Sequence, residues 1–417
     1  MELHSILAEV IMIQRNIFGA LKRLSSSFPT VLVTGARQTG KTTLLKEYIM
    51  KGDCSYITFD NPDSMILAKN DAKLFMSLNP PPAIFDEIQY VPDLFRYIKI
   101  EVDSDRKNGM YFMTGSQQFN MMKNVSESLS GRIGILNLLP LSLREIKGDS
   151  CDQAFIPTED FIISRNNKAK QKNTPFEIWS YIQKGMYPEL YAASISARDF
   201  YSAYIKTYIE RDVRQLTQVA DEMLFMQFIA VAAARTGQLV NFADMARTVG
   251  IDPKTAKQWL SVLQTSGLVY LLYPYCGNIE KRLVKTPKLY FTDTGLAAHL
   301  TRWFSPDTLM AGAMAEAFFE TFVVDEIVKS FTNAGLDAPL YFYRDSDSAE
   351  IDLLIESDGT LYPVEIKATS TPKEHDAKNL SKTAHITDKK IARPIIICNT
   401  TETGLAKNAI TFPVQFV

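Results

Sequence analysis

Short apolar runs alternate with amphipathic stretches over roughly the first third of the chain. The runs are rich in β-branched and aromatic residues and have the length of buried strands. They are Thr30 to Thr34, Tyr56 to Phe59, Ala83 to Phe85, Met110 to Met113 and Ile135 to Leu139. The stretches between them repeat apolar residues at helical spacing, so the pattern predicts an α/β fold with helices covering a parallel sheet. A lead-in helix is predicted from Glu2 to Leu24, ending before Ser25.

The pattern changes in the second half of the chain. A polar stretch from Arg165 to Asn173 predicts a loop, and Ile178 to Ala234 has helical spacing throughout. Val240 to Tyr275 then contains two short helical segments followed by the strand-like run LVYLLYPY, an order that is typical of a winged helix. From Gly312 onward, a helix precedes several strand-like runs.

The segment GARQTGKT fits the phosphate-binding pattern GxxxxGK[S/T], and it lies between a predicted strand and a predicted helix, as a P-loop does. Glycines let the backbone N–H groups face phosphate, while Lys41 reaches the β and γ phosphates and Thr42 offers a hydroxyl to Mg²⁺. The predicted nucleotide-binding residues are Gly35, Ala36, Arg37, Gln38, Thr39, Gly40, Lys41, Thr42 and Thr43.

Hydrolysis of ATP also requires a metal ligand and an activated water. In AIFDEIQ, a short apolar strand ends in Asp86, a candidate Mg²⁺ ligand, and Glu87, placed to polarise the attacking water. Ser116 or Gln117 could sense the γ phosphate, although a plain turn also explains them. Arg132 could supply positive charge to the transition state, from the same chain or a neighbouring copy, or it could be an ordinary exposed arginine.

Taken in order, GARQTGKTT, AIFDEIQ, TGSQQ, ESLSGR, LLPLSLREI, YIERDV, KRLVKTPKLYFTDTGL, YRDSDSAEIDLLI and VEIKAT resemble a family of prokaryotic AAA-type P-loop ATPases. Members of that family carry a winged helix and a restriction-nuclease-like fold in a C-terminal region of uncharacterised function. The resemblance implies that ATP and Mg²⁺ are the cofactors.

A second candidate site lies near the C-terminus. EIDLLI and TLYPVEIK flank Asp358 and Gly359, which predicts a hairpin with Asp352 on one strand and Glu365 and Lys367 on one face of the other. Two carboxylates and a lysine are the PD-(D/E)xK nuclease arrangement, in which the carboxylates hold Mg²⁺.

By the family pattern, Glu320 on the preceding helix would add an acidic ligand. Alternatively, these are charged residues on the solvated face of a hairpin, or the fold has lost its chemistry.

Composition limits the partners only weakly. The net charge of -2 and pI near 6.2 give no global sign of a nucleic-acid binder. The predicted winged helix still offers Lys254, Lys257 and the neutral, polar Gln258 for phosphate contacts, and KRLVKTPK adds a local basic run, although winged helices also pack against proteins. Four scattered cysteines and four histidines form no zinc pattern, so we expect reduced, mostly buried thiols. With neither a membrane-spanning run nor a signal sequence, we expect a cytoplasmic protein.

The sequence therefore predicts four parts: a P-loop ATPase domain (1–150), a helical region (151–236), a winged helix with its connection (237–305) and a nuclease-like α/β domain (306–417). The leading hypothesis is an ATPase coupled to DNA binding and to Mg²⁺-dependent DNA cleavage. The alternatives are an ATP-driven switch that binds proteins or DNA with an inactive C-terminal scaffold, and a ring-forming, chaperone-like homo-oligomer.

Overall fold

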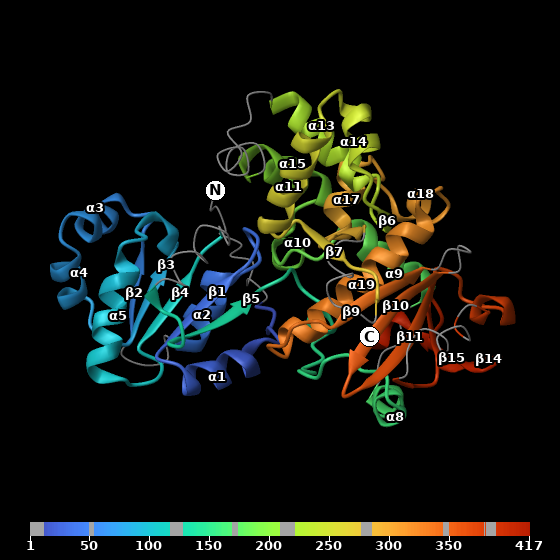
Figure 1. Ribbon diagram of the computed structural model, residues 1–417, viewed down its shortest axis with the longest axis horizontal. Coiled ribbons are helices and arrows are strands. Elements are labelled where there is room, and N and C mark those ends of the chain that lie inside the picture. Colours follow the sequence, from blue (N-terminus) through green and yellow to red (C-terminus); the bar gives the residue numbers. More distant parts are fainter. Residues whose placement is uncertain are drawn as a thin grey trace, which may run out of the picture.

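The computed structural model describes residues 12–49, 54–116, 128–168, 174–208, 222–276, 286–344, 350–378, 380 and 389–417. Several predicted features fall outside these residues. They are residues 2–11 of the lead-in helix, Gln117, residues 169–173 of the polar stretch, residues 209–213 of YIERDV, and residues 281–285 of the basic run. Figure 1 shows the N-terminal parallel sheet on one side of the molecule and the C-terminal mixed sheet on the other.

The N-terminal domain is the predicted parallel sheet, in the order β2-β3-β4-β1-β5. All five predicted strands are present, with bounds shifted by two residues at most. They are β1 (Thr30–Thr34), β2 (Ser55–Thr58), β3 (Ala83–Asp86), β4 (Tyr111–Thr114) and β5 (Ile133–Asn137). The covering helices are α1 (Phe18–Ser27), α2 (Lys41–Ile49), α3 (Pro62–Asn70), α4 (Ala72–Leu78) and α5 (Leu94–Asp105), with a short 3₁₀ turn η1 (Ile88–Tyr90).

Both faces of the three inner strands, β3, β4 and β1, are buried, as parallel strands require. Val31 and Val33 pack with α1 and α2 on one face, while Leu32 and Phe85 pack with the helices α3 to α5 on the other. Because β1 lies between β4 and β5, the loop that follows it is central at the carboxyl edge of the sheet, beside the ends of β3 and β4. This is where open α/β sheets bind ligands.

Two local predictions are wrong. Helix α1 does not end before Ser25 but continues to Ser27, where the hydroxyls of Ser26 and Ser27 bond back to the carbonyls of Lys22 and Arg23 at 2.9 Å. The polar stretch from Arg165 is not a loop at its start, because helix α8 (Glu159–Lys168) extends through it. Arg165 is buried there and donates to Phe416 O at 3.0 Å, so it does not belong to a solvated basic surface.

The middle of the chain is helical, as predicted, and then forms a small three-stranded sheet in the order β6-β8-β7. Its helices are α7 (Leu143–Ile146), α8, α9 (Pro175–Lys184), α10 (Glu189–Ala192), α11 (Ala197–Tyr204) and α13 (Glu222–Ala233). These are followed by β6 (Gln238–Leu239), α14 (Phe242–Val249), α15 (Pro253–Thr265), β7 (Val269–Leu272) and β8 (Lys288–Phe291). The predicted breaks are present, since Gly250 ends α14 with a positive φ and Asp252 caps α15.

The C-terminal part is a mixed sheet in the order β14-β15-β13-β11-β10-β9, with β12 beside β11. The helices before it are α17 (Thr294–Leu300), α18 (Pro306–Met310) and α19 (Ala315–Asn333). The strands are β9 (Leu340–Arg344), β10 (Glu350–Ser357), β11 (Thr360–Lys367), β12 (Lys390–Ile391), β13 (Ile395–Cys398), β14 (Gly404–Ala406) and β15 (Ala409–Pro413). The predicted hairpin is confirmed: β10 and β11 pair antiparallel across a turn at Asp358 and Gly359.

The largest hydrophobic cluster runs through the middle and C-terminal parts without a break, from Leu141 to Val417. The four cysteines are free, but only Cys398 is buried, so the expectation of mostly buried thiols is wrong. Among the described residues, no helix combines the length and apolar character needed to cross a membrane.

Candidate functional site

The P-loop joins β1 to α2 and borders a cavity of ≈ 400 Å³ at the carboxyl edge of the sheet. Its shape depends on Gly35, whose φ of +137° is rarely open to other residues and where a Cβ would lie 2.2 Å from Leu138 O. The cavity is lined by Arg37, Gln38, Gly40, Lys41, Thr42, Thr43, Glu87, Thr207 and Tyr208. Gly35, Ala36 and Thr39 shape the loop from behind, since the buried Thr39 hydroxyl donates to Ala36 O at 3.0 Å.

Lys41 is the main cation of this cavity. It is 6% exposed, and its ammonium group donates to Ala36 O at 2.8 Å and Gly35 O at 3.1 Å. Burial lowers the pKa of Lys41 to about 8, against the opposing effect of Glu87 and Asp86. A bound triphosphate would add negative charge beside the ammonium group and favour its protonated form.

Asp86 lies at the end of β3, within reach of the P-loop. The Thr42 hydroxyl donates to its Oδ1 at 2.8 Å, and the Tyr56 hydroxyl donates to its Oδ2 at 2.7 Å. Thr114, at the end of β4, donates to the same carboxylate. A hydroxyl and a carboxylate side by side are the pair that holds Mg²⁺ in P-loop enzymes, so Thr42 and Asp86 fit that ion.

Glu87 follows directly and lines the cavity. Its backbone is left-handed, with φ 58°, and its N–H donates to Thr114 Oγ1 at 3.1 Å. Ser116 lies 3.5 Å from the carboxylate of Glu87, which also accepts from Gln89. Ser116 is therefore near Glu87 but is not among the residues that line the cavity.

Arg132 does not join this group. It directly precedes β5, and its carbonyl accepts from Thr30 N at 3.2 Å, level with the start of β1. The P-loop leaves the opposite end of β1, about 13 Å further along at 3.3 Å per residue. Arg132 pairs instead with Asp103 on α5, at 2.5 Å. A transition-state role within the same chain is thus wrong, because β5 runs parallel to β1 and begins at the far edge of the sheet.

The C-terminal candidates do converge. Asp352 on β10 lies beside Glu365 and Lys367 on β11, and the ammonium group of Lys367 is 2.7 Å from Glu365 Oε1 and 3.6 Å from Asp352 Oδ2. Asp352 also accepts from Ile366 N at 2.8 Å. Burial, followed by the charge of Asp352, raises the pKa of Glu365 to about 8. Glu365 Oε2 is buried and has no hydrogen-bond partner in the described structure.

Glu320, on α19, is engaged by the middle sheet. Its Oε1 accepts from Lys288 Nζ at 2.9 Å and from the Tyr290 hydroxyl at 2.6 Å, both on β8. Lys288 is 5% exposed at its side chain, so its assignment to a basic contact surface is wrong. Within the described part of the chain, no three histidine, cysteine or acidic side chains are arranged to hold a metal ion. As built, the C-terminal site does not fit Mg²⁺.

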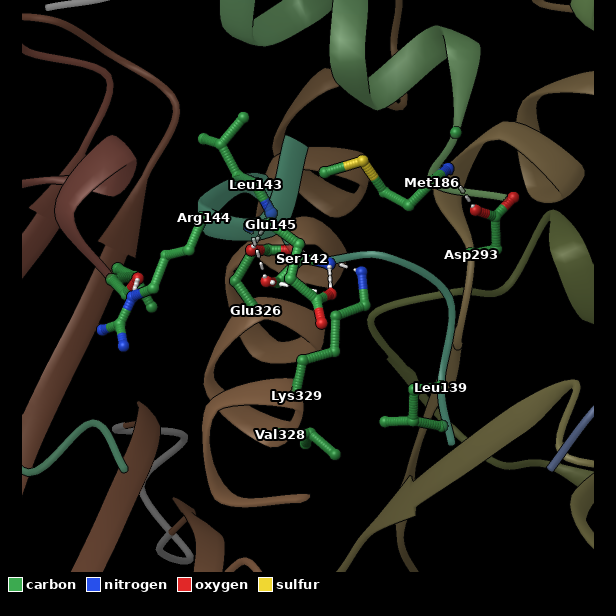
Figure 2. A network of polar contacts seen from close by, with 12 residues as sticks. Leu139, Ser142, Leu143, Arg144, Glu145, Met186, Asp293, Glu326, Val328 and Lys329 are labelled. Atoms are coloured by element: carbon green, nitrogen blue, oxygen red, sulfur yellow. Dashed lines mark hydrogen bonds and ion pairs between the residues drawn. The ribbon is translucent and has the colours of Figure 1, made fainter. Parts of the chain in front are cut away.

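A buried polar network joins the P-loop to the C-terminal part. Arg15 donates to Thr39 O at 2.7 Å and to Glu145 Oε1 at 3.0 Å. Glu145 closes a capping box with Ser142 at the start of α7. The next residue, Leu143, donates its N–H to Glu326 of α19 at 2.7 Å, as Figure 2 shows. Three bonds thus connect the nucleotide loop to the helix that also carries Glu320.

Residues 27–147 match the family model of an AAA domain. This part of the chain is thus similar to a P-loop ATPase domain, in agreement with the loop built around Lys41. Two further models match segments beyond it: a domain of unknown function (DUF8612) at residues 176–307 and another (DUF4143) at residues 315–415.

Similar proteins include uncharacterized proteins of two prokaryotes. Rv2008c of Mycobacterium tuberculosis is 29% identical over 388 residues, 92% of this chain and 79% of that protein. MJ1637 of Methanocaldococcus jannaschii is 25% identical over 297 residues, 63% of this chain and 60% of that one.

Among solved structures, a Walker-type ATPase of Pyrococcus abyssi has a TM-score of 0.45 at 14% identity, covering 69% of this chain and 96% of that one. The Thermotoga maritima RuvB Holliday junction branch migration motor has a TM-score of 0.29 at 14% identity, covering 61% and 88%.

Several functional candidates escaped sequence reasoning. Thr207 and Tyr208 come from the helical region, yet they line the nucleotide cavity. The guanidinium carbon of Arg37 lies over the Tyr208 ring, 5.7 Å from the ring centre. Tyr56 and Thr114 lie within apolar strand sequences, so nothing beside them in the sequence indicated a functional role. For Thr114, its position at the carboxyl end of a strand could have indicated that its hydroxyl lies near the P-loop.

Proposed function

We propose that the protein is a Mg²⁺-dependent ATPase that couples nucleotide hydrolysis to DNA binding by its middle and C-terminal parts. One observation carries this proposal: the cavity beside Lys41 and Glu87 is walled partly by Thr207 and Tyr208 of the middle part. A nucleotide that fills the cavity would contact both parts of the chain. Binding energy at the P-loop would then change how the middle part sits on the ATPase sheet.

Each residue of the ATPase site has a distinct role in this proposal. Lys41 and the P-loop N–H groups hold the phosphates, and Thr42 with Asp86 would hold Mg²⁺, which supplies charge neutralisation at the phosphates. Glu87 accepts a hydrogen bond from the attacking water and orients it toward the γ phosphorus. Ser116 and Gln89 hold the Glu87 carboxylate in position.

DNA binding is proposed for the helix-turn-helix and its sheet. The order α13, β6, α14, α15, β7, β8, with β8 between β6 and β7, supports a winged helix. On α15, Lys254, Lys257 and Gln258 are exposed on one face, where they can contact phosphates or base edges. Asp244 does not reduce this charge, because it is paired with Arg235 and Arg247.

We also propose DNA cleavage by Asp352, Glu365 and Lys367, which requires their carboxylates to leave the present arrangement, because that arrangement does not fit Mg²⁺. The mixed sheet and the convergence of these three side chains support a PD-(D/E)xK fold. The alternative, a switch that binds protein partners or DNA through an inactive scaffold, is favoured by one observation: Glu320 is held by Lys288 and Tyr290. We further propose the division at residues 150, 236 and 305, a cytoplasmic location, and a homo-oligomer in which Arg132 acts on a neighbouring copy's nucleotide.

The decisive experiment measures ATP hydrolysis and DNA binding and cleavage with Mg²⁺, for the wild type, Lys41→Ala and Asp352→Ala. We expect Lys41→Ala to lose nucleotide binding and, with it, the ATP dependence of DNA binding. Asp352→Ala should keep ATPase activity and lose cleavage. If ATP changes neither DNA binding nor cleavage in the wild type, the coupling is refuted. If Asp352→Ala retains every activity, the C-terminal part is a scaffold.

A further inference from the structure

The nucleotide cavity contains a second cation besides Lys41. Arg37 belongs to the same loop between β1 and α2, and of the described residues that line the cavity these two carry positive charge. Burial lowers the pKa of Lys41, and the positive charge of Arg37 adds to this effect, so the two cations are close neighbours. Two like charges side by side favour an anion between them, and a bound triphosphate would supply it.

Arg37 is half-buried, and its guanidinium group is contacted from two parts of the chain. It donates to the Tyr90 hydroxyl at 3.5 Å, and Tyr90 ends the turn η1 that directly follows Glu87. Its guanidinium carbon also lies over the ring of Tyr208 from the middle part, 5.7 Å from the ring centre. An aromatic face attracts a cation without using its N–H donors. The middle part thus orients Arg37 through a ring.

The Tyr208 ring is fixed in turn by the winged-helix segment. It is 5% exposed, and its hydroxyl donates to Ser266 O at 3.4 Å, directly after α15. At the next residue, Gly267, φ is +71° and a Cβ would lie 3.5 Å from Ala36 N, so this turn lies against the P-loop residue that precedes Arg37. A displacement of α15 relative to the ATPase sheet would therefore move the ring that Arg37 contacts.

Hydrolysis of ATP needs positive charge at the γ-phosphate oxygens, and an arginine often supplies it. Arg132 cannot do so within the chain, because it lies at the far edge of the sheet. Arg37 is at the correct edge and lines the cavity together with Glu87, the residue proposed to orient the attacking water. A guanidinium group offers paired N–H donors to two phosphate oxygens and keeps its charge at neutral pH.

We propose that Arg37 contacts the γ-phosphate oxygens of bound ATP and stabilises the charge on them during hydrolysis, and that Tyr208 is the positioning residue that holds its guanidinium group. This inference rests on the proposed function, which assigns the cavity to ATP. It deepens that function by naming how the site is regulated: the middle part controls hydrolysis through the Tyr208 ring.

Arg37 takes no part in the bond changes themselves. The water oxygen bonds to the γ phosphorus while the bond from that phosphorus to the β–γ bridging oxygen breaks, and its electron pair stays on ADP. The proton lost by the water passes by way of Glu87 to phosphate or solvent. Arg37 keeps its protons and supplies charge only.

The test measures ATP hydrolysis, with Mg²⁺, and the binding of ADP and of a non-hydrolysable ATP analogue by the full-length protein. We expect Arg37→Met to lower kcat about 10²–10³-fold, as loss of one transition-state donor does. Its affinity for ADP should stay within about 2-fold of the wild type, while that for the analogue falls about 10-fold, because ADP lacks the γ phosphate. Arg37→Lys keeps the charge but not the paired donors, so its kcat should lie between the two.

Tyr208 is tested by two substitutions. Tyr208→Leu removes the ring and should lower kcat about 10-fold, whereas Tyr208→Phe keeps the ring and should stay within about 2-fold of the wild type. Since Tyr208 acts through Arg37, the double variant Arg37→Met/Tyr208→Leu should be no slower than Arg37→Met alone. Arg198→Met is the matched control and should leave kcat unchanged, because Arg198 lies over the ring of Phe304, at 5.1 Å, and does not line the cavity.

The outcomes separate this inference from the proposed function. A wild-type kcat in Arg37→Met would overturn the inference and leave the ATPase standing. Equal losses of ADP and analogue affinity would also overturn it, because Arg37 would then only shape the loop. If Arg37→Met does not fold, Arg37→Lys decides the same question by its kcat at unchanged ADP affinity. No hydrolysis by the wild type would refute the proposed function and the role of Arg37 with it.

Discussion

The buried ion pair between Arg15 and Glu145 gives the sharpest prediction for stability. The two side chains are 7% and 0% exposed, and they meet at 3.0 Å. Glu145 also accepts from Asn16 N and Ser142 N, each at 2.8 Å, on different carboxylate oxygens. In Glu145→Gln, an NH₂ group replaces one carboxylate oxygen. Since both oxygens accept hydrogen bonds, this NH₂ group must face N–H donors, which then lose their acceptor. Breaking a buried pair in this way costs about 3–5 kcal/mol.

The control is a pair on the surface of the same domain. Arg132 and Asp103 meet at 2.5 Å with side chains 33% and 39% exposed, and an exposed pair of this kind contributes little to stability because water screens it. At roughly 2–4 °C per kcal/mol, Glu145→Gln should lower the melting temperature by on the order of 10 °C, and Asp103→Asn by at most a few degrees. Differential scanning calorimetry measures both.

A double-mutant cycle with Arg15→Met separates the pair from its surroundings. Each single substitution, Arg15→Met or Glu145→Gln, leaves a buried partner unpaired and should destabilise the protein. The double variant should lose less stability than the sum of the two single losses. Equal shifts for Glu145→Gln and Asp103→Asn would refute the reasoning, because burial would then have no effect on the pair's contribution. Additive single effects would show that Arg15 acts mainly through its bond to the P-loop carbonyl of Thr39.

Three further outcomes are expected. Glu87→Gln should bind a fluorescent ATP analogue normally but release phosphate about 10²–10⁴-fold more slowly; full turnover would remove Glu87 from water activation. Gly35→Ala places a Cβ 2.2 Å from Leu138 O and should abolish nucleotide binding, whereas Gly148→Ala, with positive φ but open space around it, should only lower the melting temperature slightly. In EDTA, the folded state holds a proton on Glu365 up to a pKa of about 8, while the unfolded state releases it near 4.5, so stability should fall as pH rises between these values. Melting temperatures of Glu365→Gln should lose that part of the slope, and an unchanged slope would contradict the shift.

The ATPase site could be read from the sequence because its parts are local. A strand, a glycine-rich turn and a helix follow one another in GARQTGKT, and Asp86 and Glu87 end a strand whose neighbours are fixed by the parallel alternation. Arg132 could not be placed in the same way. Its position depends on where β5 begins relative to β1, and nothing in the residues around it states that register.

The C-terminal group shows the same limit. The hairpin of β10 and β11 was predictable because a two-residue turn fixes its register, and with it the meeting of Asp352 and Glu365. The engagement of Glu320 by Lys288 and Tyr290 was not, because it depends on how two separate sheets pack against α19. From the sequence, Lys288 was one lysine in a basic run, and only its surroundings show that it is buried.

Helix α19 also bears on how these proteins can be divided. Fourteen of its nineteen residues are buried, among them Asp325, Glu326 and Lys329, so nearly every side of the helix is covered by another part of the chain. One hydrophobic cluster passes through it, containing Trp259 of the middle part and Phe412 of the last strand. The two matched regions, 176–307 and 315–415, therefore share one hydrophobic core. A fragment that ends between them would expose apolar side chains that the other region covers, so each region depends on the other for burial.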